Sequence, residues 1–232
     1  LIERAIKGVD TVYHVCPGIQ PREREIGFAW IDAAHVAGVR HFVFSSVLHA
    51  ILSELVQHRI KRQIEEHLLS SHLEFTILQP TIYMAPRRFE RIFETGILRA
   101  GWSLERHQSL IDIGDITDVA ATVLTDGESH FGATYELAAP GRYTAHDMAA
   151  IIAELLGKTV TVERIGAEAY LQGLFPDRDP GTMPFEVSVS QSLSARYSSN
   201  DFIGNPNVLT WLLGRQPRRF EEFVASYGSK PA

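Results

Sequence analysis

Three short apolar runs in the first third of the chain predict buried β-strands. They cover residues 11–16, 41–46 and 75–80, and β-branched and aromatic side chains dominate each of them. Each run is shorter than a typical helix and carries the residue types that favour strands.

Two longer segments between these runs have the spacing of amphipathic helices. Residues 22–37 and 53–69 both place apolar side chains three or four positions apart. We expect Gly38 to end the first helix and Ser53 to cap the second. Strand, helix, strand, helix, strand is the order that right-handed crossovers give in a parallel sheet, so the sequence predicts an α/β fold.

Beyond residue 85 the pattern is less regular. We predict a smaller, mixed α+β lobe there, with a change of lobe inside one unit and no linker between independent domains. Residues 1–85 and about 109–138 would form the core of the sheet, and residues 86–108 and 139–232 the substrate-side lobe. The expected elements are helices at 88–93, 115–124 (capped by Asp115), 145–156 (capped by Thr144), 167–171, 184–195, 206–213 and 218–225, and strands at 109–113, 135–137 and 159–164.

Composition and charge exclude several kinds of partner, cofactor and location. The chain has 232 residues, 45% of them hydrophobic, and a net charge of −6, which argues against a nucleic-acid partner. No apolar run reaches the length of a membrane helix. Cys16 is the single cysteine, which excludes an internal disulfide and fits a reducing, cytoplasmic location. No metal-binding pattern is present, so we expect no metal.

The ends of the three runs are the candidate ligand site, because ligands of parallel sheets bind at the carboxyl ends of the strands. Lys61, on the second helix, would bring an ammonium group to the same edge. The strand-end candidates are Cys16, Pro17, Ser45, Ser46, Pro80, Thr81 and Ile82.

Three of these candidates also have a purely structural interpretation. Lys61 could pair with Glu65 one turn away, Ser46 could cap a turn, and Cys16 could belong to the core. The aspartates at 112, 115 and 118 could suggest a cation site, but helix capping and the dipole at a helix start explain them better. The arginines at 87, 88 and 91 form either a solvated helix face or a site for an anionic substrate.

Five segments, in order, resemble the NmrA-like branch of the atypical short-chain dehydrogenase/reductases. They are residues 38–46, 61–65, 75–80, 112–120 and 212–220. The resemblance implies a doubly wound, mostly parallel Rossmann-like sheet and an NADP or NAD site. It places Lys61 at the cofactor ribose, Ser45 and Ser46 beside the nicotinamide, Pro80, Thr81 and Ile82 over its amide, and Cys16 and Pro17 at the flanking strand end.

Two departures from the family pattern bear on activity. No glycine-rich phosphate loop occurs in the sequence, which predicts an N-terminally truncated fragment with impaired cofactor binding. Gln57 stands where active short-chain reductases carry a tyrosine, four residues before Lys61, so no proton donor is expected there. The neighbouring His58 would point about 100° away, and Lys61 is the one weak catalytic candidate.

The resemblance favours an NAD(P)H-dependent reductase that transfers hydride to a small quinone- or enone-like substrate. A redox-sensing or regulatory protein that binds the cofactor without turnover is the alternative, and an inactive fragment is the third interpretation. The expected partner is a small-molecule substrate, with no nucleic acid and no membrane, and a homodimer is left open.

Overall fold

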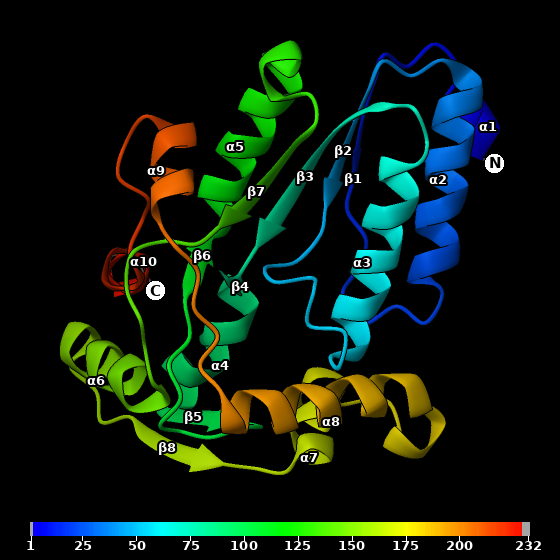
Figure 1. Cartoon of the computed structure of the whole chain (residues 1–232). Helices are drawn as coiled ribbons and strands as arrows, with labels where there is room; N and C mark the ends of the chain where they lie inside the picture. The colour runs from blue at the N-terminus through cyan, green and yellow to red at the C-terminus, as the bar shows by residue number, and fades with distance from the viewer. Residues whose placement is uncertain (1, 229–232) are drawn as a thin grey trace. The chain divides into compact units, whose positions relative to one another are not determined.

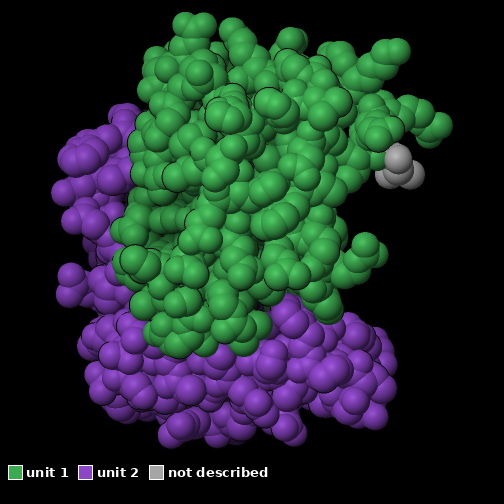
Figure 2. All heavy atoms as spheres, turned by 45° about the vertical axis from the view of Figure 1, so that its right-hand side comes forward, with its two compact units in different colours: residues 1–80, 116–137 green, residues 81–115, 138–232 purple. Residues whose placement is uncertain are grey.

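The computed structural model describes residues 2–228 and divides the chain into two compact units (Figures 1 and 2). Unit 1 consists of Leu1–Pro80 and Ile116–Leu137, and unit 2 of Thr81–Asp115 and Ala138–Ala232. The chain therefore passes between the units three times. Unit 2 contains more residues than unit 1, so the expectation of a smaller second lobe is wrong.

Unit 1 is built on a four-stranded parallel sheet in the order β1-β2-β3-β7. The strands are β1 (Thr11–His14), β2 (His41–Ser45), β3 (Glu74–Pro80) and β7 (Ala133–Leu137). In the register, His14 lies opposite Phe44, Ser45 opposite Leu78 and Pro80 opposite Leu137. The three predicted strands are confirmed, and their carboxyl ends lie side by side at one edge of the sheet.

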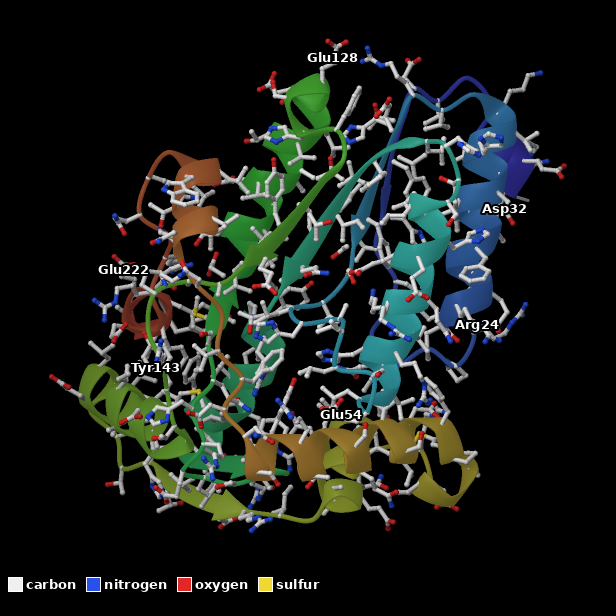
Figure 3. All side chains as sticks on the ribbon, viewed as in Figure 1. Arg24, Asp32, Glu54, Glu128, Tyr143 and Glu222 are labelled. Carbon is white, nitrogen blue, oxygen red and sulfur yellow. The ribbon has the colours of Figure 1, made fainter. Side chains whose placement is uncertain are left out.

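Two long helices lie side by side against this sheet (Figure 1). They are α2 (Glu23–Ala37), which ends at Gly38 with a φ of 71°, and α3 (Val56–Leu69). Their close approach depends on Gly27, because a Cβ there would meet Ile64 Cδ1 at 2.8 Å. Asp32, labelled in Figure 3, links α2 to α3 through its Oδ1, 2.7 Å from His67 Nε2. The remaining helices of unit 1 are α1 (Ile2–Ala5), most of α5 (Ile113–Thr125) and the 3₁₀ turn η1 (Gly127–His130).

The start of α3 differs from the prediction. The helix begins at Val56, Leu55 occupies the cap position, and no side chain caps it. Ser53 instead belongs to a turn in which its N–H donates to the carbonyl of Ile51 at 2.8 Å. The helical periodicity of the sequence did not reveal this turn.

Unit 2 holds two parallel strand pairs, β4 with β6 and β5 with β8. Its elements are β4 (Ile82–Met84), α4 (Pro86–Thr95), β5 (Ile97–Ala100), β6 (Leu110–Asp112), α6 (Ala145–Leu156), β8 (Thr161–Arg164), α7 (Ala167–Leu174), η2 (Pro180–Thr182), α8 (Pro184–Ser199), α9 (Asn207–Leu213) and α10 (Phe220–Gly228). Thr144 caps α6, as expected from the sequence, and the structure adds Asp147 as its partner in a capping box.

Asp115 does not cap α5, because the helix begins two residues earlier, at Ile113. Its buried carboxylate instead accepts a hydrogen bond from the Arg218 N–H at 2.7 Å and pairs with Arg215 at 2.8 Å. Asp115 therefore fixes the segment before α10, a long-range role that local spacing cannot predict. Within residues 2–228, every helix is too short or too polar to span a bilayer.

Candidate functional site

Lys61 is held at the carboxyl end of β2 by two polar partners. Its Nζ donates to the Ser45 carbonyl at 2.8 Å and lies 2.7 Å from Glu23 Oε1. It also lies 5.0 Å from the centre of the Phe44 ring. Only 5% of Lys61 is exposed. The ammonium group is therefore fixed at the strand end, where the sequence places the ligand site.

Glu23 is the buried ion-pair partner of Lys61 that the sequence analysis did not identify. It begins α2 on the same buried face as Gly27 and Ile31, which follow at four-residue intervals. Its Oε2 has no hydrogen-bond partner among residues 2–228. Burial raises the pKa of its carboxyl, and the charge of Lys61 acts in the opposite direction. A carboxylate on the apolar stripe of a helix is the sequence signal that could have indicated this ion pair.

The backbone after β2 continues along the end of β3. The Ser46 N–H donates to the Leu78 carbonyl at 2.7 Å, and the Leu48 N–H donates to the Pro80 carbonyl at 2.9 Å. Ser45, Ser46 and Pro80 are therefore brought together, and all three are buried.

Glu65 takes a different partner from the one that its helical spacing suggests. Its Oε1 accepts a hydrogen bond from Gln79 Nε2 at 2.8 Å, whereas the ion pair of Lys61 is made with Glu23. Burial raises the pKa of the Glu65 carboxyl. Gln79 belongs to β3, so polar contacts tie α3 to the end of β3 as well as to the end of β2.

The end of β1 contributes an imidazole and a thiol. His14 is buried, with its ring centre 5.9 Å from that of Phe44, and burial together with the charge of Lys61 lowers its pKa to about 4. Cys16 is buried as well, and burial raises the pKa of its thiol. Near neutral pH the imidazole is neutral and the thiol protonated, so the thiol has the character of an inert core group.

The other candidates are placed as follows. Pro17 is exposed just beyond β1. Thr81 and Ile82 belong to unit 2, where Thr81 Oγ1 donates to the Ser109 carbonyl at 3.0 Å and Ile82 pairs with Leu110. Among the described residues, no cluster of three or more histidine, cysteine, aspartate or glutamate side chains is arranged to bind a metal.

Gln57 and His58 lie in the first turn of α3. Gln57 is half-buried and has no titratable group. His58 is fully buried, and its Nδ1 lies 3.1 Å from the carbonyl of His49. The proton donor expected at this place in active short-chain reductases is therefore not provided by Gln57.

The parallel sheet, its crossover helices and the polar strand ends define an α/β protein with a Rossmann-like fold. The family model described as "NmrA-like family" matches residues 1–223, and the chain belongs to this family.

Two characterised relatives are similar along nearly the whole chain. A (4-alkanoyl-5-oxo-2,5-dihydrofuran-3-yl)methyl phosphate reductase from Streptomyces griseus is 26% identical, and an NAD(P)H azoreductase from Xenophilus azovorans is 27% identical. Each alignment covers 97% of this chain and 78% of the relative.

Solved structures show the same fold. An NADPH-dependent quinone oxidoreductase from Escherichia coli, solved with NADPH, is 22% identical with a TM-score of 0.81 over 97% of this chain and 79% of the other. A triphenylmethane reductase from Citrobacter sp., solved with NADP(H), is 19% identical with a TM-score of 0.80 over 98% and 79%.

Proposed function

We propose that this protein is an NAD(P)H-dependent reductase that delivers hydride to a small, electrophilic, quinone- or enone-like substrate. Relatives whose names specify reductases that use NADPH, NADP(H) or NAD(P)H support the proposal. Membership of the NmrA-like family supports it as well. The single observation that carries it is the Lys61 ammonium, fixed 2.8 Å from the Ser45 carbonyl at the end of β2.

The residues at this edge are proposed to hold the nicotinamide riboside part of such a cofactor. Lys61 uses two of its three N–H groups on Ser45 and Glu23, which leaves one for a ribose hydroxyl. The residues of unit 1 proposed to surround that part are Cys16, Pro17, Ser45, Ser46, Lys61 and Pro80. In Rossmann folds a G-x-G-x-x-G loop binds the pyrophosphate of the cofactor. These 232 residues do not contain that motif.

The cofactor supplies a hydride, and the protein side chains determine what else is needed. Gln57 cannot provide a proton to the product, so the proton comes from solvent. This requirement favours acceptors whose reduced anions are stable in water, such as quinones. Lys61 contributes by holding the ribose in position, and its own ammonium is oriented by Glu23 and Ser45.

The decisive experiment compares Lys61→Met with Arg62→Met. Arg62 is the next residue of α3 and pairs with Glu66 at 3.6 Å, so its loss removes the same charge outside the site. Oxidation of NADPH and NADH is followed with a panel of quinones and enones. We expect the Lys61 variant to raise the KM for the nucleotide at least several-fold, and the Arg62 variant to behave like the parent protein. Unchanged KM values in the Lys61 variant contradict the assignment.

A cofactor-sensing protein without turnover is the second candidate, and Gln57 is the observation that favours it. Calorimetric titration with NADPH distinguishes the two functions. Binding without oxidation of the nucleotide by any acceptor of the panel favours the sensor. Absence of both binding and oxidation favours an inactive chain, and either result rejects the reductase.

A further inference from the structure

Unit 2 contains a cavity of about 600 Å³, a volume typical of small-molecule sites. It is lined by α4, β5, α6 and α7, together with the segments between them. Much of its wall is apolar or aromatic, including Phe89, Leu98, Trp102, Met148 and Tyr170. All of its lining residues belong to unit 2, so the cavity is distinct from the strand ends of unit 1.

One buried polar side chain in this wall has no hydrogen-bond partner among residues 2–228. It is Gln108, which is 1% exposed and whose Nε2 and Oε1 both lack a hydrogen bond to that part of the chain. The residue is held in place, because its N–H donates to the Tyr143 carbonyl at 2.9 Å and its carbonyl accepts from the Tyr143 N–H at 3.0 Å. Buried amides are normally satisfied, so an unpartnered amide facing a cavity indicates a ligand that completes its hydrogen bonds.

The charged side chains that line the cavity within residues 2–228 are all positive. Of the side chains that the structure describes, four arginines line it and no acidic one does. Arg99 is paired with Glu163 at 2.9 Å, and Arg106 lies 3.9 Å from Asp201. In the described part of the chain, Arg88 and Arg91 have no carboxylate within ion-pair distance. Arg88 lies 5.9 Å from the centre of the Trp102 ring, so a free guanidinium adjoins the aromatic wall.

We propose that this cavity binds an amphiphilic anion: an aromatic or alkyl body with one carboxylate or phosphate group. The apolar body would pack on the aromatic wall, and the anionic group would meet Arg88 and the Gln108 amide N–H. This inference goes beyond the proposed reductase activity, because binding here requires neither a nicotinamide nucleotide nor turnover.

The test uses two probes of equal shape, 2-naphthoate and 2-naphthamide, in calorimetric titrations of the full chain without nucleotide. We expect the carboxylate to bind about tenfold more tightly than the neutral amide, since charge-assisted hydrogen bonds are the stronger ones. Arg88→Gln should abolish this preference. Arg142→Gln is the matched control, because Arg142 is exposed and does not line the cavity, and it should retain the preference.

Gln108→Leu separates a ligand-binding role from a structural one. It should weaken naphthoate binding about tenfold and leave the urea midpoint unchanged or higher, because an unsatisfied amide is replaced by an apolar group of similar shape. A lower midpoint with unchanged binding contradicts the proposal. So does equal affinity for the two probes, or no binding of either. If the Gln108 variant does not fold, the proposal is tested by the preference for naphthoate over naphthamide in the Arg88 and Arg142 variants.

Discussion

At the scale of single residues, the buried pair of Lys61 and Glu23 makes a pH-dependent contribution to the stability of the fold. Burial raises the pKa of the Glu23 carboxyl, and Lys61 is what lowers it again. Without Lys61, the folded-state pKa of Glu23 rises further above its unfolded value. This difference in pKa lowers the free energy of unfolding. The loss is absent at pH values below the unfolded-state pKa, because Glu23 is then protonated in both states. It grows as the pH rises through the folded-state pKa.

Lys61→Met should therefore destabilise the protein by about 3 kcal/mol at pH 7 and by much less near pH 4. Urea unfolding of the variant and the parent at both pH values measures the difference. Adding Glu23→Gln should recover most of the loss at pH 7, because it removes the unpaired buried charge. An equal loss at the two pH values would show that Lys61 stabilises the fold through packing rather than through this ion pair.

Residue spacing predicted Lys61, Ser45 and Ser46 as neighbours, and the structure brings them together. It did not predict Glu23, because helical periodicity counts apolar positions and a glutamate on the buried stripe is treated as an interruption. The partner of Glu65 was also not predictable, since an i,i+4 lysine is the local choice and Gln79 is provided by another strand. Tertiary polar pairing is the information that a single sequence does not carry.

At the scale of elements, the contact between α2 and α3 depends on one position without a side chain. Gly27→Ala would place a Cβ 2.8 Å from Ile64 Cδ1 and 2.9 Å from its Cγ1. Overpacking costs typically about 1–3 kcal/mol, and the gain in helix propensity returns at most about 1 kcal/mol. We expect a net loss of about 1 kcal/mol in the free energy of unfolding, measured by urea denaturation.

Truncating the facing side chain provides the matching test for this contact. Adding Ile64→Ala to Gly27→Ala should cost less than the sum of the two single changes, because the new methyl group fills part of the space that isoleucine vacates. Strict additivity, or a Gly27→Ala protein as stable as the parent, would show that the two helices separate without cost.

Element types were predicted better than element boundaries. The three β-branched runs and the two periodic helices of unit 1 are present, whereas β4 and β5, each of three or four residues, were not predicted. β1, β6 and β8 are no longer than these, but each lies within a longer run that the sequence analysis predicted as a strand. The pairing of β4 with β6 and of β5 with β8 is long-range in the sequence.

At the scale of the whole molecule, unit 1 is discontinuous in the sequence. β7 joins the sheet beside β3, and the Thr76 hydroxyl of β3 donates to the His130 carbonyl at 2.7 Å. Residues 1–80 alone should therefore show no cooperative urea transition, because β3 would be an open edge with unsatisfied backbone groups. Joining residues 1–80 to 116–137 by a short flexible linker should restore a transition by circular dichroism. A cooperative transition in residues 1–80 alone would contradict this prediction.

The parallel strands β1, β2 and β3 end side by side at one edge of the sheet, and this arrangement has a practical consequence. Because the strands are parallel, the connections that precede them, at residues 38–40 and 71–73, open onto the opposite rim from Ser45 and Pro80. Along β2 the two rims are separated by about 13 Å, at roughly 3.3 Å per residue. A fluorescent dye or affinity tag attached at these connections would report on the folding of unit 1 without occupying the rim where Lys61 is anchored.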